Sequence, residues 1–518
     1  MLHRSLMVML LVGLSTLVCA AHARAAGGIT SDHPNIVFIL ADDLDVEYPS
    51  NTWNKYPLLH NVMNKQGATF LNSFVNVSLC CPSRLSILRG QYAHNTGMFD
   101  NETPHGGFAM AYERGLEAST IATWLKTSGY RTILLGKYLN GYPSNPPGDT
   151  YVPPGWTDWF AGSADNYSQF NYFVNGNGHI VHYGLTPNDY LQDVMRKKAV
   201  AFIADNAAKP DRPPFFMYLA SYSPHQPAAY APRHASRFAA AIAPRVPTFN
   251  QADLSGLPFW MQSVPPLKAA DIAAIDTLYR NRLRSMCALV ETVDAVISKL
   301  AQTGDLENTY IFFTSDNGFH LGQHRFKPGK NQFFEEDVRV PLIVRGPGVP
   351  AGVTREQMTL NIDFAPTFAE LAGIPVPASV DGRSLVPLLR AAPPPRGAWR
   401  QAFLMERGWF GRPNAPTIKM ARETPQSSLE PPDQDAAEPA AANTSPAFDG
   451  LHTQRYVYLE YYNARAPELY DLQNDPYQSS EVANSASPGL LVAFSAWLDT
   501  LRHCKGQGCR TAEDHPPY

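Results

Sequence analysis

The sequence predicts an α/β protein: a large mixed, mainly parallel sheet flanked by helices, followed by a smaller C-terminal α+β domain. Short apolar runs rich in β-branched and aromatic residues end at clusters of polar side chains, and amphipathic helical patterns separate the runs. The composition changes after about residue 385, where proline and alanine become frequent. With 518 residues, 44% of them hydrophobic, the chain can bury a large core and form more than one domain.

The N-terminal segment, residues 1–25, is typical of a signal peptide. A short positive region from Met1 to Arg4 precedes an uncharged apolar run from Ser5 to Val18, and two small-x-small cleavage sequences follow. The pattern predicts an exported protein, secreted or periplasmic, and lysosomal or extracellular if the source is eukaryotic. A lipoprotein interpretation of Cys19 is weaker because the bulky Val18 precedes it.

The rest of the chain argues against two kinds of partner. A net charge of −4 with no basic run gives no reason to expect nucleic acid binding. No later segment approaches the ~20 continuous apolar residues that cross a bilayer, so we expect no membrane span.

Five apolar runs are predicted strands of the main sheet. Four of them lead directly into polar clusters: 35–40 into Ala41-Asp42-Asp43, 132–135 into Gly136-Lys137, 215–219 into Ser221 and His225, and 310–313 into Ser315-Asp316-Asn317-Gly318. The fifth, 341–344, has no such cluster. Continuous apolar runs of this length suit strands buried on both faces, as in a parallel sheet, where ligands gather at the carboxyl ends.

Helical patterns lie between these strands. The segments 119–127 (with Ser119 as a capping residue), 189–204 and 275–300 place apolar residues at three-to-four spacing. Strands alternating with helices imply right-handed crossovers, and we assign residues 30–385 to this larger α/β domain.

A smaller C-terminal domain is predicted over residues 386–518. It begins near a proline-rich breaker at 391–395, and residues 424–450 have the composition of a flexible surface loop. Beyond the loop, 454–462 is a predicted strand, 468–472 precedes a turn, and 490–501 is a predicted closing helix.

The cysteines divide into three groups. Cys504 and Cys509 lie close together, which in an exported protein predicts a disulfide. Cys287 falls within a helical pattern and is expected to be a small buried hydrophobe. Cys80 and Cys81 are adjacent, and no second pair stands at a spacing that would make a zinc site with them.

Two acidic clusters at different strand ends predict a metal site. Adjacent carboxylates such as Asp42 and Asp43 repel each other unless a cation neutralises them, although such a pair is also common at a helix N-cap. Asp316 and Asn317 add a carboxylate and an amide oxygen, although Asp-Asn-Gly is also a favourable turn sequence. Oxygen ligands favour a hard ion, and four protein ligands favour Ca²⁺ over Mg²⁺.

Cys80 opens a predicted helix that reads Cys80-Cys81-Pro82-Ser83-Arg84 and stops at Gly90. A helix N-terminus favours negative charge through its free N–H groups and macrodipole, which suits a nucleophile. The alternatives are a structural cysteine or a redox thiol of low pKa. Plain thiol chemistry does not call for Pro-Ser-Arg downstream of the cysteine.

From Asn35 to about Pro341 the chain resembles the type I sulfatases of the alkaline-phosphatase superfamily, particularly N-acetylglucosamine-6-sulfatases and the arylsulfatases close to them. The resemblance extends to 468–477 in the smaller domain. The Cys-x-Pro-Ser-Arg element is its most specific part. The matching stretches are Ala41-Asp42-Asp43, Cys80 to Gly90, Gly136 to Asn140, Ser315 to Gly318, and Gly329-Lys330 with Glu335, Arg339 and Pro341.

The resemblance implies a role for each matched residue. Cys80 would be oxidised to Cα-formylglycine by a formylglycine-generating enzyme, and its hydrate would be the nucleophile. Ca²⁺ would be held by Asp42, Asp43, Asp316 and Asn317 together with residue 80. Arg84 would support the hydrate, Lys137 and Lys330 would bind sulfate oxygens, and His225 would lie near the leaving group.

Three positions are left open. Lys327 is a second candidate for the role of Lys330 because the loop before it varies in length. Leu139 stands where many arylsulfatases have a histidine, with Asn140 or water as substitutes. His94 and Asn95 could face the substrate or pack a loop.

The expected activity is hydrolysis of sulfate monoesters of aryl alcohols or carbohydrates, so the partner is a sulfated small molecule or glycan. One alternative is a formylglycine-dependent phosphonate or phosphodiester hydrolase. Another is an inactive secreted homologue that binds glycans.

Overall fold

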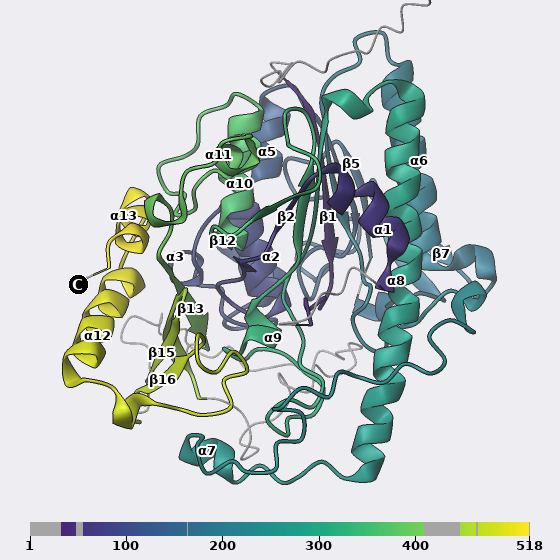
Figure 1. The fold of residues 1–518 in the computed structure, drawn as a ribbon. Helices are drawn as coiled ribbons and strands as arrows, with labels where there is room; N and C mark the ends of the chain where they lie inside the picture. Colours follow the sequence, from purple (N-terminus) through teal and green to yellow (C-terminus); the bar gives the residue numbers. More distant parts are fainter. Residues whose placement is uncertain (1–32, 48–54, 163, 409–445, 463–464, 517–518) are drawn as a thin grey trace, which may run out of the picture.

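The computed structural model describes residues 33–47, 55–162, 164–408, 446–462 and 465–516 (Figure 1). The predicted signal peptide and residues 424–445 of the predicted loop lie outside these ranges. Within them, no helix combines the length and apolar character that a membrane crossing requires.

A ten-stranded sheet forms the centre of the larger domain, as predicted. Its strand order is β11-β2-β10-β9-β1-β8-β4-β5-β6-β7. The strands are β1 Asn35–Ala41, β2 Ala68–Phe70, β4 Arg131–Gly136, β5 Asp158–Gly162, β6 Tyr172–Gly176, β7 His179–Tyr183, β8 Phe215–Ala220, β9 Thr309–Ser315, β10 Leu342–Arg345 and β11 Val353–Arg355. The short strands β3 Ser73–Phe74 and β12 Thr359–Leu360 pair separately.

The middle of the sheet is parallel. β1 pairs in parallel with β8 and β9, and β4 pairs in parallel with β8 and β5. All seven residues of β1 are buried, which explains why its sequence is continuously apolar rather than alternating. The apolar run 341–344 suggests another parallel strand. In the structure the corresponding strand β10 lies antiparallel to β9, which makes the sheet mixed.

Helices cover both faces of this sheet, with α6 and α8 on one side and α10 on the other (Figure 1). One core packs α2 Cys80–Arg89, α5 Ile121–Thr127 and α10 Phe364–Leu371 against the sheet, and the second packs α1 Pro57–Val62, α6 Leu191–Ala208 and α8 Ala269–Thr303. The predicted cap of α5 is off by one residue: Thr120, not Ser119, accepts the hydrogen bond from the Thr123 N–H.

The shorter helices of the larger domain lie mostly in its connections. They are α3 Ala93–Thr96, α4 Gly107–Glu113, α7 Phe259–Gln262, α9 Glu335–Val338 and α11 Val386–Leu389.

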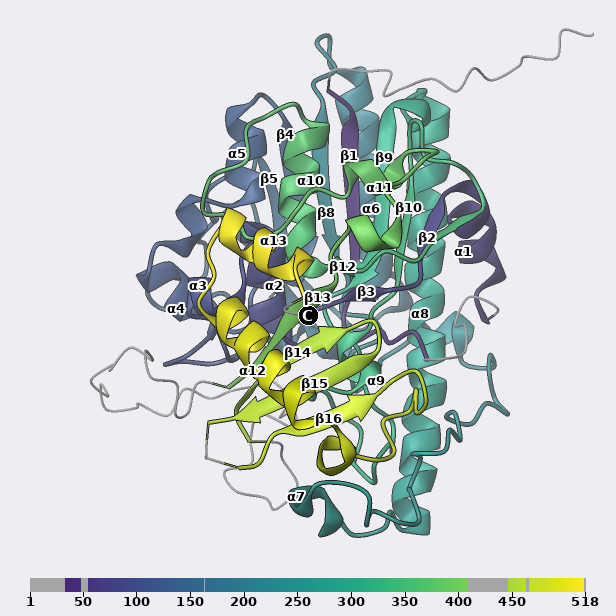
Figure 2. The same ribbon diagram turned by 60° about the vertical axis from the view of Figure 1, so that its left-hand side comes forward.

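The C-terminal part is a four-stranded antiparallel sheet with two helices against it (Figure 2). Its elements are β13 Ala402–Arg407, β14 Phe448–Thr453, β15 Tyr456–Tyr461, β16 Glu468–Asp471, α12 Pro488–Arg502 and α13 Gln507–Asp514. Residues 448–450, placed in the predicted loop, belong to β14. A disulfide joins Cys504 to Cys509, as predicted.

Candidate active site

The four strands that carry the polar clusters end at the same level of the sheet. Ala41 at the end of β1 pairs with Ser315 of β9, while Ala220 of β8 lies opposite both Leu40 and Gly136. The residues that follow these strands therefore emerge together at the carboxyl edge. This alignment places Asp42, Lys137, His225 and Asp316 in one region, although up to 274 residues separate them along the chain.

Cys80 is the first residue of α2 and points into this region. Its Sγ lies 3.4 Å from Asp42 Oδ1, 3.9 Å from Asp43 Oδ1 and 2.8 Å from Lys330 Nζ. All four residues are buried. The thiol marks where a nucleophile would stand, between two carboxylates and an ammonium group at a helix N-terminus.

The helix that carries Cys80 is tied to the neighbouring strand ends. Ser83 Oγ donates to the Asp316 carbonyl at 2.5 Å, and Arg84 Nε donates to Asp316 Oδ2 at 2.8 Å. Arg84 Nη1 donates to the Lys137 carbonyl at 3.0 Å. The structure thus shows Arg84 bonded to Asp316 and to the Lys137 backbone, which fixes the first turn of α2 at the sheet edge.

Asp42 is ionised in this setting. Burial alone would raise the pKa of its carboxyl group, but Lys137 and Arg84 outweigh burial and hold the pKa below its ordinary value. Lys137 Nζ lies 2.9 Å from Asp42 Oδ2 and 3.2 Å from Oδ1. Two buried cations therefore surround one carboxylate.

The acidic cluster fits a cation. Asp43 Oδ2 and Asn317 Oδ1 are buried, and neither accepts a hydrogen bond within the described parts of the chain. Ligand atoms of Asp42, Asp43, Cys80 and His225 lie within 4.8 Å of one another. Buried oxygen atoms without donors are costly unless a positive ion or water satisfies them, and oxygen donors suit a hard cation.

Asp316 differs from the other predicted metal ligands because protein groups already occupy its carboxylate. Its Oδ1 accepts the backbone N–H groups of Asp43 at 3.1 Å and Asn317 at 2.9 Å, and Oδ2 accepts from Arg84. The Asp316 carboxylate therefore also orients the backbone of Asp43 and Asn317, the residues that carry Oδ2 and Oδ1 of the acidic cluster.

His225 enters the site from the loop after β8. Its Nδ1 lies 2.7 Å from the Gln226 carbonyl oxygen, which can only accept, so Nδ1 carries a proton. Its Nε2 lies 3.6 Å from Asp43 Oδ2 and faces the cluster. The ring of Tyr167 stacks on the imidazole with centroids 4.1 Å apart.

The structure distinguishes between the alternatives at two open positions. Lys330 is buried against Cys80, whereas Lys327 is exposed. His94 Nε2 donates to the Cys504 carbonyl, and its Nδ1 pairs with the Glu406 carboxylate at 3.0 Å. Asn95 donates to the same Cys504 carbonyl, so His94 and Asn95 pack against the C-terminal domain. Leu139, which stands where many arylsulfatases have a histidine, is buried.

Burial raises the pKa of the Cys80 thiol well above its ordinary value, and the charges of Lys137 and Lys330 offset this only in part. A redox or nucleophilic cysteine needs the opposite shift. The raised pKa therefore disfavours the redox interpretation of Cys80.

Two residues at the site, Arg282 and Tyr167, are not among those that the sequence predicts. Arg282 of α8 donates to the Asp43 carbonyl at 2.5 Å and to the Pro224 carbonyl at 3.3 Å. Tyr167 lies in the irregular connection between β5 and β6. A polar residue on the buried face of a long helix was the only available hint for Arg282, and none existed for Tyr167.

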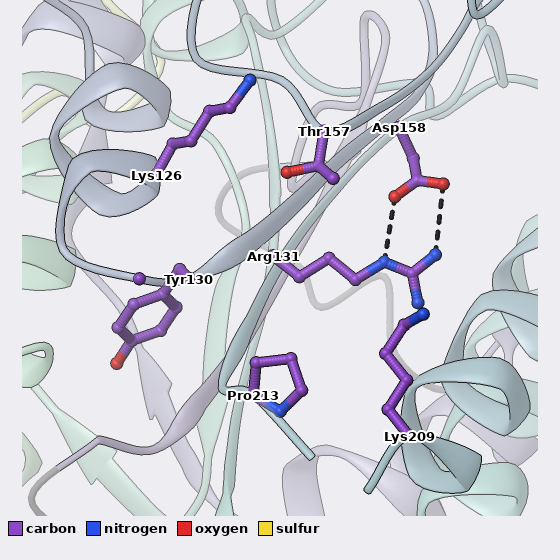
Figure 3. Close-up of a pocket in the computed structure, with 8 residues that line it drawn as sticks. Lys126, Tyr130, Arg131, Thr157, Asp158, Lys209 and Pro213 are labelled. Carbon is purple, nitrogen blue, oxygen red and sulfur yellow. Dashed lines mark hydrogen bonds and ion pairs between the residues drawn. The ribbon is translucent and has the colours of Figure 1, made fainter. Parts of the chain in front are cut away.

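A separate pocket of about 450 Å³ opens at the amino edge of the sheet, where β4 and β5 begin (Figure 3). Arg131 in this pocket pairs with Asp158 at 3.0 Å and with Asp205 at 2.6 Å. Lys126 donates to the Trp156 carbonyl. Its cations thus have protein partners, and none of the predicted site residues lies there.

Comparison with known proteins agrees with this geometry. The sulfatase family model matches residues 34–374. N-acetylglucosamine-6-sulfatase of Capra hircus is 33% identical over 511 residues, which cover 96% of this chain and 88% of that protein.

Solved structures share the fold. A protein solved in complex with its substrate D-glucosamine-2-N,6-O-disulfate has a TM-score of 0.71 at 22% identity, with 94% of this chain and 99% of that chain covered. Phosphonate monoester hydrolase of Silicibacter pomeroyi has a TM-score of 0.64 at 21% identity, with 91% and 95% covered. By the family match and the identity to its relatives, this chain belongs to the sulfatase family and is a sulfatase, an enzyme that hydrolyses sulfate esters.

Proposed function

We propose that this sulfatase removes 6-O-sulfate from an amino sugar, using formylglycine made from Cys80 and a Ca²⁺ ion. The observation that carries the mechanism is the position of Cys80 Sγ, 3.4 Å from Asp42 Oδ1 and 2.8 Å from Lys330 Nζ at the start of α2. A nucleophile in this place can approach a cation and a bound sulfate at once.

Asp42, Asp43 and Asn317 would hold the ion together with residue 80, and Asp316 would complete or orient the set. Asp43 Oδ2 and Asn317 Oδ1, which accept no hydrogen bond from the described residues, support this assignment. Ca²⁺ is preferred over Mg²⁺ because several protein oxygens suit its larger coordination shell. When bound, the ion supplies positive charge that lowers the pKa of a neighbouring hydroxyl and polarises a sulfate oxygen.

One hydroxyl of the aldehyde hydrate would attack sulfur and displace the alcohol. The second hydroxyl would then lose its proton and expel sulfate, which regenerates the aldehyde, a step that a serine or cysteine cannot provide. Lys137 and Lys330 bind sulfate oxygens and stabilise charge that grows on the transferring group. Arg84 holds residue 80 at the sheet edge through Asp316. These fixed cations lie on the buried side of the site, away from water.

His225 serves the leaving group. Its Nδ1 proton is held by the Gln226 carbonyl, so Nε2 is the nitrogen that faces the reacting atoms. In the imidazolium form, which carries a proton on each ring nitrogen, the ring passes its Nε2 proton to the oxygen of the departing alcohol and keeps the Nδ1 proton. Sugar alcohols are poor leaving groups, so this proton matters most for carbohydrate sulfates.

The substrate class rests on the relatives. The N-acetylglucosamine-6-sulfatase of Capra hircus aligns with nearly the whole chain, and the structural neighbour has a 6-O-sulfated glucosamine as its substrate. The signal-like N-terminus supports action outside the cytoplasm, with a formylglycine-generating enzyme as the maturation partner.

The decisive experiment replaces Cys80 with alanine and uses Cys81→Ala as the matched control. Cys81 is equally buried but contacts Met98 rather than the acidic cluster. We expect Cys80→Ala to abolish sulfate release from N-acetylglucosamine 6-sulfate, and Cys81→Ala to retain most of it. Peptide mass spectrometry of the wild type should show residue 80 lighter than cysteine by about 18 Da. Full activity of Cys80→Ala would refute the proposal.

Hydrolysis of phosphonate monoesters is the rival reaction, because a phosphonate monoester hydrolase shares the fold. Rates on p-nitrophenyl sulfate and on a phenyl phosphonate monoester separate the two. A kcat/KM for the phosphonate above that for every sulfate tested would assign the chain to the rival.

A further inference from the structure

Tyr167 lies against His225 and comes from the connection that follows β5. It is in the 3₁₀ turn Ala164–Ser168, within the β5–β6 connection, and its side chain is only 4% exposed. Its ring is nearly parallel to the His225 imidazole, with a centroid separation of 4.1 Å and an interplanar angle of 24°. Such a contact fixes the plane of the imidazole ring.

The tyrosine ring is itself anchored on other elements. Lys137 Nζ lies 5.0 Å from the ring centroid, within range of a cation–π interaction. Lys137 is immobilised by its two contacts with Asp42. Tyr222 meets the same ring edge-on at 5.5 Å. Because β5, β4 and β8 are adjacent in the sheet, residues from three neighbouring strand ends meet at this ring.

The hydrogen bond made by Nδ1 does not tie the imidazole to another part of the fold. The Gln226 carbonyl that bonds Nδ1 belongs to the next residue, so it moves together with the loop that carries His225. Tyr167 instead connects the imidazole to Lys137 and Asp42, which are set by different strands. The tyrosine ring therefore couples the plane of the imidazole to residues that other strands position.

We infer that Tyr167 is a positioning residue that holds the His225 imidazole so that Nε2 meets the leaving oxygen. The inference rests on the proposed role of His225. It assigns the function to the aromatic ring rather than to the phenol hydroxyl, because the stacking and the cation–π contact both use the ring face.

The role has a kinetic signature. A proton is needed for a phenol or alcohol that leaves poorly, whereas p-nitrophenolate leaves without one. A misplaced imidazole should therefore slow phenyl sulfate far more than p-nitrophenyl sulfate. General packing damage would slow both esters equally.

The experiment compares kcat and KM of Tyr167→Leu, Tyr167→Phe and His225→Ala on these two esters. We expect Tyr167→Leu to lower kcat for phenyl sulfate by at least about 10-fold and for p-nitrophenyl sulfate by less than about 3-fold, with little change in KM. Tyr167→Phe should restore phenyl sulfate turnover to within about 3-fold of wild type. His225→Ala should show the same selectivity, with a larger loss.

A double variant and a matched control complete the design. If Tyr167 acts through His225, adding Tyr167→Leu to His225→Ala should cause no further selective loss. Tyr172→Leu removes another fully buried tyrosine of the same region, one that stacks on Tyr183 at 5.1 Å, and should not alter the ratio of the two rates.

Equal losses on both esters, additive effects in the double variant, or failure of Tyr167→Phe to restore turnover would each overturn the role of Tyr167. A wild type that releases sulfate from neither ester nor from the amino-sugar sulfate would instead overturn the proposed function. The two failures are therefore distinguishable, and neither depends on which sugar is the natural substrate.

Discussion

At the scale of single residues, Arg282 shows how a helix on one face of the sheet controls the acidic cluster. Asp43 has a left-handed backbone with φ of 66°, which costs free energy in a residue other than glycine. The Arg282 guanidinium bonds the Asp43 and Pro224 carbonyls and lies 4.3 Å from the centroid of the Phe319 ring. Arg282 thus holds both the turn of the acidic cluster and the loop that leads to His225.

Arg282→Met should release this strained turn. Removing one partner from buried carbonyl groups costs on the order of 3 kcal/mol in the free energy of unfolding, and we expect the Ca²⁺ concentration for half-maximal activity to rise about 10-fold. Denaturant unfolding and a Ca²⁺ titration measure the two effects. Arg280→Met, a half-exposed neighbour on α8, is the control and should match the wild type in both.

Lys330 and Lys327 provide a second comparison between residues. Lys330→Met removes an ammonium group 2.8 Å from the Asp43 carboxylate and the Cys80 sulfur, so kcat/KM should fall by at least about 100-fold. Lys327→Met alters an exposed side chain and should leave kcat/KM within about 2-fold of wild type. A larger loss in Lys327→Met than in Lys330→Met would reverse this assignment.

At the scale of helices and strands, the parallel core could be predicted because burial on both faces leaves continuous apolar runs. The positions of Asp42, Lys137 and Asp316 follow from that prediction, since parallel strands share one carboxyl edge. The direction of β10 could not be predicted, because pairing is decided by the connection and not by the run itself. Tyr167 was missed because it reaches the site from an irregular segment.

The contact between α9 and β14 links the two parts of the molecule through a buried carboxylate. Burial alone would raise the pKa of Glu335, but Arg339 and His452 outweigh burial and lower it to about 2. Its folded value therefore lies below the ordinary 4.5 of a glutamate. Ionised Glu335 contributes its full stabilisation above about pH 4.5, and that contribution is lost as the pH falls toward about 2.

Glu335→Gln should consequently be less stable than wild type at neutral pH, by on the order of 3 kcal/mol. The difference should shrink as the pH is lowered from about 4.5 toward 2. Urea unfolding across this range provides the measurement. Glu356→Gln, which removes an exposed pair with Arg396, is the control and should be nearly neutral throughout. A constant difference at every pH would contradict the role of Glu335.

At the scale of the whole molecule, residues near the C-terminus stabilise the segment that follows α2. The disulfide loop places the Gly506 N–H 2.6 Å from Asp381 Oδ1, and Asp381 Oδ2 accepts from the Tyr92 N–H and from Asn95. The Cys504 carbonyl contacts His94 in the same region. The last residues therefore help to fix a segment more than 400 positions earlier.

Replacing both cysteines with alanine should test this coupling. We expect the free energy of unfolding to fall by about 2 kcal/mol, the loop-closure entropy for so short a loop. Thermal unfolding with and without reductant measures the effect: the wild type should respond to reductant, and the variant that lacks both Cys504 and Cys509 should not. Cys287→Ala is the control, since Cys287 is a free buried thiol and its loss should not change the response to reductant.

The complete burial of Cys80, with Ser83 and Arg84 beside it at 1% exposure or less, has a consequence for the timing of maturation. Once the polypeptide has folded around this motif, an oxidising enzyme has no access to it. In the proposed maturation, oxidation would therefore precede folding, on a nascent or exported chain, and native protein made without the oxidase should stay inactive when the oxidase is added later. Unfolding the protein and refolding it in the presence of the oxidase should restore turnover.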